Sequence, residues 1–446
     1  MRISLQTGSI IALLVITASG AADLTPLRAD LDALAKTLVW AGKGQIHATY
    51  SPVVPAAKKA AASLDLVIKQ DPKSVPQGLK YAFALSRMVD ESQYLSDLSA
   101  GPNYVQGALD ADIFMFAQVD EWKYTITSII DNLIKPSTFK PPPAGNTKAP
   151  GINKSTPVGT KFKEGAKGID LIVVPPGTFT AGSDADEQNT WNVPANRRDF
   201  ELPHRQVKIT YPLAFGTTEV TVAQFDQFVQ ATGYQPRGGA RWWNPNNTTD
   251  LVMFFRSDLS YLNPGFPSGP THPAVAIQRL DAEAYAAYLS IITGARYRLP
   301  TEDEWEYAAR AGSQDTFFWG HDIADCVSYA NTYDLTAKAA NKFPWDNTPV
   351  TDNFQHTAPV ASFKPNKFGL YDVTANAREF TQDTWIRDLS TAKSDGSAHF
   401  GPHIFPVLRG GGWNYQQQNL RINYRSAYLS SEVATNMFGF RLVREL

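Results

Sequence analysis

Apolar residues recur at three- and four-residue steps through residues 23–135, which is the spacing of one helix face. Breaks at Gly42–Gly44, Asp71–Pro76 and Gly101–Pro102 divide this region into four stretches. The stretches are PLRADLDALAKTLVWAGKG, AAKKAAASLDLVIKQ, GLKYAFALSRMVDESQYLSDL and ALDADIFMFAQVDEWKYTITSIIDNLI. Amphipathic helices joined by short connections pack as antiparallel neighbours, so the sequence predicts a small α-helical bundle domain here.

The pattern changes after residue 135. Residues 136–165 are rich in Pro, Gly, Ser, Thr and Lys and have no apolar period, which predicts an extended linker. Residues 166–446 carry short β-type runs and two helical stretches, TVAQFDQFVQATG and LDAEAYAAYLSIITG, each ending at a Gly suited to a helix C-terminus. The sequence therefore predicts a compact α+β domain of low regular content, whose loops need something other than a large sheet to fix them.

The composition and the N-terminal sequence limit the possible partners and the cellular location of the protein. The net charge of -2 gives no electrostatic reason to expect nucleic acid or an anionic membrane as partner. Residues 1–22 combine Arg2, an apolar run around Ile10 to Ile16 and small residues before a cleavage point, which predicts a signal peptide. An uncleaved anchor is disfavoured, because the run is shorter than the roughly 20 residues of a spanning helix. We expect an exported, periplasmic or secreted protein with no membrane span after cleavage.

Cys326 is the single cysteine of the chain. In an oxidising compartment an unpaired thiol is buried, joined to another chain or reactive, and burial is the commonest of these. A pair of cysteines within the chain is excluded, so neither a disulfide nor a vicinal thiol pair can fix the loops. Bound metal is the natural substitute.

From residue 168 onward the chain carries a series of sequence blocks in a fixed order. They are VVPPGTFTAGS, LPHRQVKIT, TEVTVAQFDQFVQATGY, HPAVAIQRLDAEAYAAYL, YRLPTEDEWEYAARAG, FFWG, FGLYDVTANAREFTQD, LRGGGWN and FGFRLVREL. This series resembles the sulfatase-modifying-factor family, whose fold is that of the formylglycine-generating enzyme. The resemblance implies a C-type-lectin-like α+β domain with structural calcium, and it does not cover the helical bundle.

One of these blocks, RLPTEDEWEYAAR, can be interpreted from its residues alone. Thr301 and Glu304 have the spacing of a helix capping box. Arg298 and Arg310, with the acids Glu302 and Glu306, are placed for buried or semi-buried ion pairs. This block predicts a capped helix that holds the fold, and not an active site.

The resemblance implies two sets of calcium ligands. Hard cations gather carboxylate, amide and carbonyl oxygens from tight loops. The family's Gly-Asn-Val-Trp-Glu-Trp appears here as the run from Ala375 to Phe380, with Arg378 at the first Trp. Loss of the Gly and both Trp alters the loop, whereas both carboxylates are kept. The first set matches Asn331, Thr332, Asp352 and Phe354, and the second matches Asp372, Ala375, Ala377 and Glu379.

The family's catalytic thiols are absent. In the formylglycine-generating enzyme two cysteines bind copper(I), which soft thiolates suit. The matching positions here are Tyr415 and Leu420, and Gly412 replaces the family's serine. Another branch joins a helical bundle to this fold and uses three-histidine iron, but His47 is the single histidine of this bundle. Formylglycine generation and carbon–sulfur bond formation are both disfavoured.

A third branch of the family is exported, lacks the cysteine pair and is associated with oxidative maturation of siderophore chromophores such as pyoverdine. Two functions stay open: oxidative tailoring of a secreted peptide or small molecule, and non-catalytic binding of a ligand or partner on a lectin-like scaffold. The bundle is a candidate surface for a protein partner, and the identity of any catalytic metal stays open. By analogy the ligand groove has these candidate residues, which ordinary packing and ion pairing would also explain: Trp413, Asn414, Tyr415, Arg421, Tyr424, Arg425 and Tyr428.

Overall fold

The computed structural model describes most of the chain. The described residues are 23–38, 52–70, 78–100, 120–133, 135, 138–243, 253–401, 405–425 and 433–446. The predicted signal peptide, His47 and the groove candidate Tyr428 lie outside this description.

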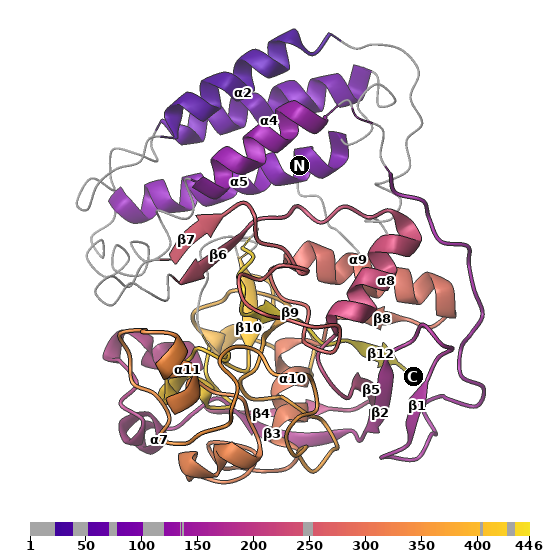
Figure 1. Ribbon diagram of the computed structural model, residues 1–446, viewed down its shortest axis with the longest axis vertical. Coiled ribbons are helices and arrows are strands. Elements are labelled where there is room, and N and C mark those ends of the chain that lie inside the picture. Colours follow the sequence, from indigo (N-terminus) through magenta and orange to yellow (C-terminus); the bar gives the residue numbers. More distant parts are fainter. Residues whose placement is uncertain are drawn as a thin grey trace.

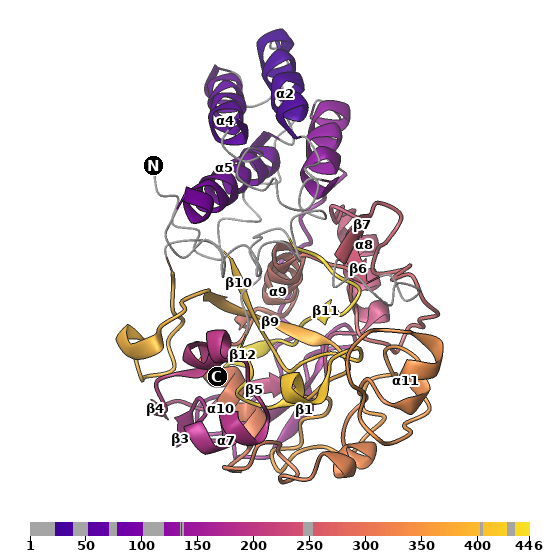
Figure 2. The same cartoon turned by 90° about the vertical axis from the view of Figure 1, so that its left-hand side faces the viewer.

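The N-terminal helices form a bundle at one end of the molecule, as Figures 1 and 2 show from two sides. Leu27, Leu31 and Leu34 lie on one face of the first helix, and all are fully buried against Leu64 and Leu85 of the next two. Each of the four predicted stretches is helical where described. The helices are α2 (Thr25–Thr37), α4 (Val53–Gln70) and α5 (Gly78–Ala100), with a further helix at residues 120–132.

The second domain is built on short strands. A five-stranded antiparallel sheet has the order β1-β2-β5-β12-β8, and a three-stranded sheet has the order β10-β9-β11. The strands are β1 (Lys161–Lys163), β2 (Asp170–Val174), β3 (Gly177–Ala181), β4 (Arg205–Ile209), β5 (Leu213–Gly216), β6 (Ala240–Trp243), β7 (Met253–Arg256), β8 (Tyr297–Arg298), β9 (Arg378–Thr384), β10 (Pro406–Arg409), β11 (Phe438–Gly439) and β12 (Val443–Glu445). β1 lies inside the predicted linker of residues 136–165, where it pairs with β2.

Helices and long loops cover these sheets. The helices are α7 (Ala185–Thr190), α8 (Val222–Thr232), α9 (Arg279–Thr293), α10 (Glu302–Arg310) and α11 (Leu335–Ala340), with 3-10 turns at Ala195–Glu201, Ile323–Ser328, Leu389–Thr391 and Gln417–Leu420. The low regular content and the α+β class are as predicted. No helix that the structure describes is long and apolar enough to cross a membrane.

The predicted helix ends are confirmed in detail. α8 and α9 end at Gly233 and Gly294, whose φ angles of 64° and 74° are left-handed. The capping box at α10 is complete, since Thr301 Oγ1 accepts from the Glu304 amide and Glu304 Oε2 accepts from the Thr301 amide. Such caps stabilise a helix by about 1 kcal/mol each.

The bundle packs directly on the second domain. Phe405 belongs to the bundle's buried core, and its ring lies 5.1 Å from that of Tyr94 in α5. Trp385 packs against the same core. Because these contacts are apolar and therefore non-directional, they hold the bundle against the domain without fixing the exact orientation of the bundle.

Candidate functional site

The predicted groove residues follow β10 through a glycine turn. Gly410 and Gly411 have left-handed φ angles of 98° and 70°. A Cβ at Gly411 would lie 2.8 Å from a backbone carbonyl oxygen, so the turn requires glycine there. The turn brings Trp413 and Asn414 into the interior, each 2% exposed, and leaves Tyr415 half-buried.

Tyr415 lies against Arg378, the first residue of β9. The buried guanidinium is 5.5 Å from the ring centroid of Tyr415 and 4.9 Å from that of Tyr424. Its NH1 donates to the Tyr415 hydroxyl oxygen at 3.2 Å. Aromatic faces attract such a cation. The sequence analysis had placed Arg378 only in the calcium loop, since no local pattern links it to Tyr415. We call these three residues the Arg378–Tyr415–Tyr424 cluster.

Asn414 and Trp413 form an interior wall beside this cluster. Trp345 Nε1 donates to the Asn414 carbonyl oxygen at 2.8 Å, and Trp413 Nε1 donates to the Asn436 carbonyl oxygen at 3.3 Å. The side-chain oxygen of Asn414 is buried and has no hydrogen-bond partner among the described atoms. A buried acceptor without a donor costs about 1–3 kcal/mol. It is therefore an acceptor that the described protein atoms leave unsatisfied.

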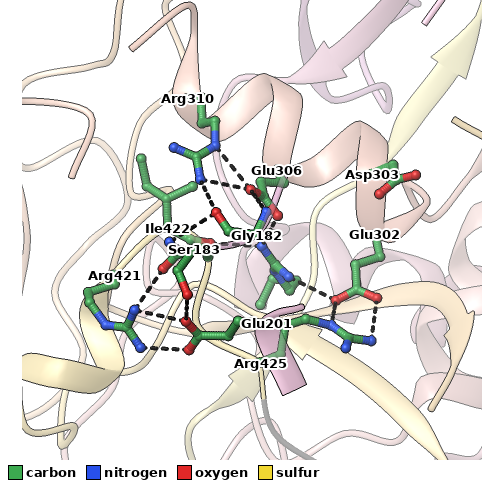
Figure 3. A network of polar contacts seen from close by, with 12 residues as sticks. Gly182, Ser183, Glu201, Glu302, Asp303, Glu306, Arg310, Arg421, Ile422 and Arg425 are labelled. Carbon is green, nitrogen blue, oxygen red and sulfur yellow. Dashed lines mark hydrogen bonds and ion pairs between the residues drawn. The ribbon is translucent and has the colours of Figure 1, made fainter. Parts of the chain in front are cut away.

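Arg421 and Arg425, also predicted for the groove, lie beneath the turn in ion pairs (Figure 3). Arg421 NH2 is 2.6 Å from Glu201 Oε1, and Arg425 donates to the two oxygens of Glu302 at 2.5 and 3.0 Å. Arg409 adds a third guanidinium, 2.8 Å from Glu302 Oε1. All five side chains are buried, so the structure places both arginines in packing and ion pairing rather than at a ligand surface.

The first predicted calcium set is gathered in one place. The Thr332 amide donates to Asp352 Oδ2 at 3.0 Å, and the Phe354 amide donates to Oδ1 at 2.8 Å. Asn331 Oδ1 is buried and has no partner among the described atoms. Burial, and after it the carboxylate of Asp334, raise the pKa of Asp352 to about 7. The unsatisfied amide oxygen of Asn331 and the buried carboxyl group of Asp352 are the oxygen ligands of this set that a hard cation prefers.

The second set lies in the tight turn at residues 372–379, where Asp372 and Ala375 have φ angles of 54° and 66°. Glu219, which precedes α8, joins it, since its Oε1 accepts from the Ala377 amide at 3.3 Å. Glu219 Oε2 and Asp372 Oδ1 are both buried without a partner among the described atoms. Burial, and after it the charges of Asp372 and Glu379, raise the pKa of Glu219 well above its ordinary value.

Glu379 is already saturated by other donors. Its two oxygens accept from Arg441 at 2.7–2.9 Å, and Oε2 also accepts from Trp305 Nε1 at 2.7 Å. Glu219 therefore offers the second carboxylate beside Asp372. The sequence analysis missed Glu219, whose only signal was an acid in the otherwise apolar start of TEVTVAQF. Three carboxyl groups share one guanidinium, and the raised pKa of Glu219 with its hydrogen bond to Asp372 shows that their full ionisation needs a further positive charge, which calcium would supply.

Both sets fit calcium through mixed oxygen donors. Within the residues that the structure describes, no three His, Cys, Asp or Glu side chains are arranged to hold a metal by themselves. A cation at either set therefore needs amide and carbonyl oxygens as well, which calcium accepts readily. A cavity of about 630 Å³ opens beside the second set, lined in part by Thr218, Ala361 and Tyr371. The Ala361 amide donates to Asp372 Oδ2 at 2.7 Å, so one residue of the cavity wall contacts that carboxylate.

Cys326 lies in the interior, and Tyr415 packs against the small cluster to which it belongs. Cys326 shares this cluster with Leu420, and its Sγ is 4.0 Å from Thr332 Oγ1. Burial raises the pKa of this thiol to about 12. The expected burial is confirmed, and at neutral pH the thiol is protonated.

We expect Cys326 to resist alkylation in the folded protein. Iodoacetamide reacts with the thiolate, which is scarce here because of the raised pKa, and the side chain is fully buried. Mass spectrometry should show no adduct at pH 8 without denaturant and complete labelling in concentrated urea. Rapid labelling of the folded chain would contradict the buried placement.

The family described as "Sulfatase-modifying factor enzyme 1-like domain" matches residues 159–446. The formylglycine-generating enzyme of Bos taurus is 30% identical over 281 residues, covering 54% of this chain and 68% of the relative. That of Thermomonospora curvata is 32% identical over 254 residues, covering 52% and 76%. The solved structure of PvdO from Pseudomonas aeruginosa is similar with a TM-score of 0.54 at 30% identity, covering 66% of this chain and all of that one.

Proposed function

This chain belongs to the sulfatase-modifying factor enzyme 1-like family, and we propose that it is an exported tailoring protein that oxidises a secreted peptide or small molecule of the siderophore-chromophore type. The observation that carries the proposal is the Arg378–Tyr415–Tyr424 cluster. Tyr415 stands at the position matched to the first copper-binding cysteine of the family, so chemistry at this place differs from formylglycine generation. The resemblance to the exported branch without cysteines supports the same conclusion.

The proposed reaction is a dehydrogenation with molecular oxygen as the acceptor. The ligand loses two hydrogen atoms with their two electrons as a new double bond forms, and oxygen becomes hydrogen peroxide. The charge of Arg378 stabilises negative charge that develops on the phenol oxygen of Tyr415 during proton transfer with the ligand. The half-buried ring of Tyr415 is the part of the cluster that a flat ligand would pack against, and the buried ring of Tyr424 supports it from the interior.

Calcium has a structural part in this proposal. The first set would hold it through Asn331 and Asp352, and the second through Asp372 and Glu219, each with backbone carbonyl oxygens of the same loops. Bound calcium supplies positive charge that fixes the loops around β9 and β10. The N-terminal pattern of residues 1–22 supports the proposed export.

A non-catalytic binding protein is the second candidate. The burial of Trp413, Arg421 and Arg425 favours it, because it leaves few polar side chains to act on a ligand. Metal analysis and oxygen uptake distinguish the two functions. Calcium alone, with no oxygen uptake in the presence of the ligand, would favour the binding protein, whereas oxygen uptake coupled to ligand oxidation supports the tailoring protein.

We expect Tyr415→Phe to lower the tailoring rate about 100-fold, because a polar group that acts on developing charge is removed while the ring is kept. A host strain without the gene should accumulate a secreted compound two hydrogen atoms heavier than the final product. Secreted metabolites are compared by mass spectrometry after complementation with the wild-type gene or a variant. The Tyr415→Phe gene should fail to restore the final product.

Tyr261→Phe is the matched control for this test. It removes a tyrosine hydroxyl that donates to Asp226 at 2.7 Å in the same domain but outside the cluster. This variant should restore the final product. Full restoration by Tyr415→Phe would exclude Tyr415 from the reaction, and a deletion strain with no heavier compound would exclude dehydrogenation.

A further inference from the structure

The helical bundle is linked to the interior wall of Trp413 and Asn414 through one buried carboxylate, Glu121, in the helix at residues 120–132. We infer that Glu121 is a positioning residue of the groove, so that the bundle is a working part of the site. The role of the bundle in the reaction rests on the proposed function, but its control of the groove wall is measurable without any ligand.

Glu121, in the bundle, forms ion pairs with two arginines of the second domain. Its Oε2 accepts from Arg241 Nε at 2.7 Å and lies 2.5 Å from Arg241 NH2, and its Oε1 lies 2.6 Å from Arg237 NH2. Glu121 is 1% exposed and Arg241 is 0% exposed. Ion pairs this deeply buried are strong and directional, and loss of one partner leaves an uncompensated charge in the interior.

Arg241 connects Glu121 to the indole of Trp413 through backbone hydrogen bonds. It lies in β6, where its amide donates to the Ala434 carbonyl oxygen at 2.7 Å and its own carbonyl accepts from the Asn436 amide at 3.4 Å. The same stretch forms a parallel bridge between Arg241 and Thr435. The Asn436 carbonyl oxygen then accepts from Trp413 Nε1 at 3.3 Å. Glu121 thus reaches the wall through Arg241 and one backbone segment.

A second series of contacts connects β6 to Asn414. Trp243, at the other end of β6, packs on Trp345 with ring centroids 5.1 Å apart. Trp345 Nε1 donates to the Asn414 carbonyl oxygen at 2.8 Å. The strand that Glu121 holds is therefore linked to both residues that precede Tyr415, to Trp413 through Asn436 and to Asn414 through Trp345. A shift of β6 would move the wall on which the unsatisfied Asn414 oxygen lies.

The remaining bundle contacts make a specific test possible. Phe405 and Trp385 pack against the bundle core at a different place, so the bundle stays docked when Glu121 changes. Lys80 Nζ donates to the Gln235 carbonyl oxygen at 3.2 Å and is exposed. Lys80→Gln therefore changes a polar contact between the bundle and the domain that is made neither by Glu121 nor to Arg241, and it is the matched control.

Hydrogen exchange of the full-length chain, followed by mass spectrometry, tests the inference. In Glu121→Gln, the amides of residues 433–437 and of β6 should exchange about 10-fold faster, while those of α2 and α10 keep the wild-type rate. Lys80→Gln should leave all four segments unchanged, and Glu121→Asp, which keeps the charge, should show a smaller increase than Glu121→Gln. Unchanged exchange at residues 433–437 would overturn the inference, as would an increase spread evenly over both domains.

The complementation assay then separates this inference from the proposed function. Faster exchange at residues 433–437 together with loss of the final product in Glu121→Gln supports both. Faster exchange with the final product fully restored supports control of the wall by Glu121 and contradicts a reaction that depends on it. Unchanged exchange alongside a defect in Tyr415→Phe overturns the role of Glu121 and leaves the proposed function standing.

Discussion

Glu302→Gln is expected to lower the free energy of unfolding by about 3–5 kcal/mol, because it removes the one acid that faces both Arg409 and Arg425. Both guanidinium groups and the carboxylate are buried, with Arg425 Nε 2.5 Å and Arg409 NH1 2.8 Å from Glu302 Oε1. In Glu302→Gln, Arg425 would face only neutral acceptors among the described residues, namely the carbonyl oxygens of Phe200 and Ile386 and the amide oxygen at position 302. Urea unfolding followed by circular dichroism measures the loss.

The pH dependence of this stability has a definite sign. Burial alone would raise the pKa of Glu302, but Arg425 and Arg409 lower it from its ordinary 4.5 to about 2. A lowered folded pKa stabilises the protein fully above 4.5, and this contribution disappears as pH falls toward 2. The difference in stability between the wild-type protein and Glu302→Gln should therefore shrink in that interval.

Asp199→Asn is the control for Glu302→Gln. Asp199 pairs with Arg387 at 2.6 Å, and both side chains are 50% exposed. Exposed pairs contribute about 0–1 kcal/mol, so this variant should remain within that range of the wild-type protein. Equal losses in the two variants would contradict the special role of the buried network.

The same network shows how far the sequence could predict the site. The acids of α10 were expected in ion pairs, and Arg310 does pair with Glu306 at 2.8 Å. Glu302, however, pairs with arginines more than a hundred residues later in the chain. Helix periodicity and capping depend on neighbours within a few residues, so they identify α10 and its caps. They carry no information about which distant side chain completes a buried charge.

The Arg378–Tyr415–Tyr424 cluster also depends on contacts between residues that are distant in the sequence. Tyr415 was singled out because the family's blocks align around it, but Arg378 and Glu219 were not recognised as site residues. Arg378 meets Tyr415 because β9 and β10 are paired, with Leu408 opposite Phe380. This register depends on the assembled sheet. The contacts of Glu121 could not be predicted for a similar reason, since in the sequence it is one acid on an ordinary amphipathic helix.

Calcium removal is the prediction with the other large effect, and it tests the two oxygen sets directly. We expect chelation to lower the free energy of unfolding by about 2.7 kcal/mol per site, relative to calcium at a hundred times its dissociation constant. The physical reason is the set of buried oxygens without a partner among the described atoms, namely Asn331 Oδ1, Asp372 Oδ1 and Glu219 Oε2. Thermal unfolding in excess calcium, in chelator and in magnesium measures the effect, and magnesium should replace calcium poorly because it demands a tighter octahedral site.

Asp372→Asn and Asp383→Asn assign the calcium response to the second set. Asp383 is a buried carboxylate like Asp372, but its oxygens accept from the amides of His399 and Glu302 at 2.7 and 2.6 Å. Asp372→Asn should lose about half of the stabilisation by calcium, because one of two sites loses a charged ligand. Asp383→Asn should keep the full response, whatever its own stability, because it lies in neither set. A midpoint that is the same in calcium and in chelator would exclude both sites, whereas a full response in Asp372→Asn would exclude the second.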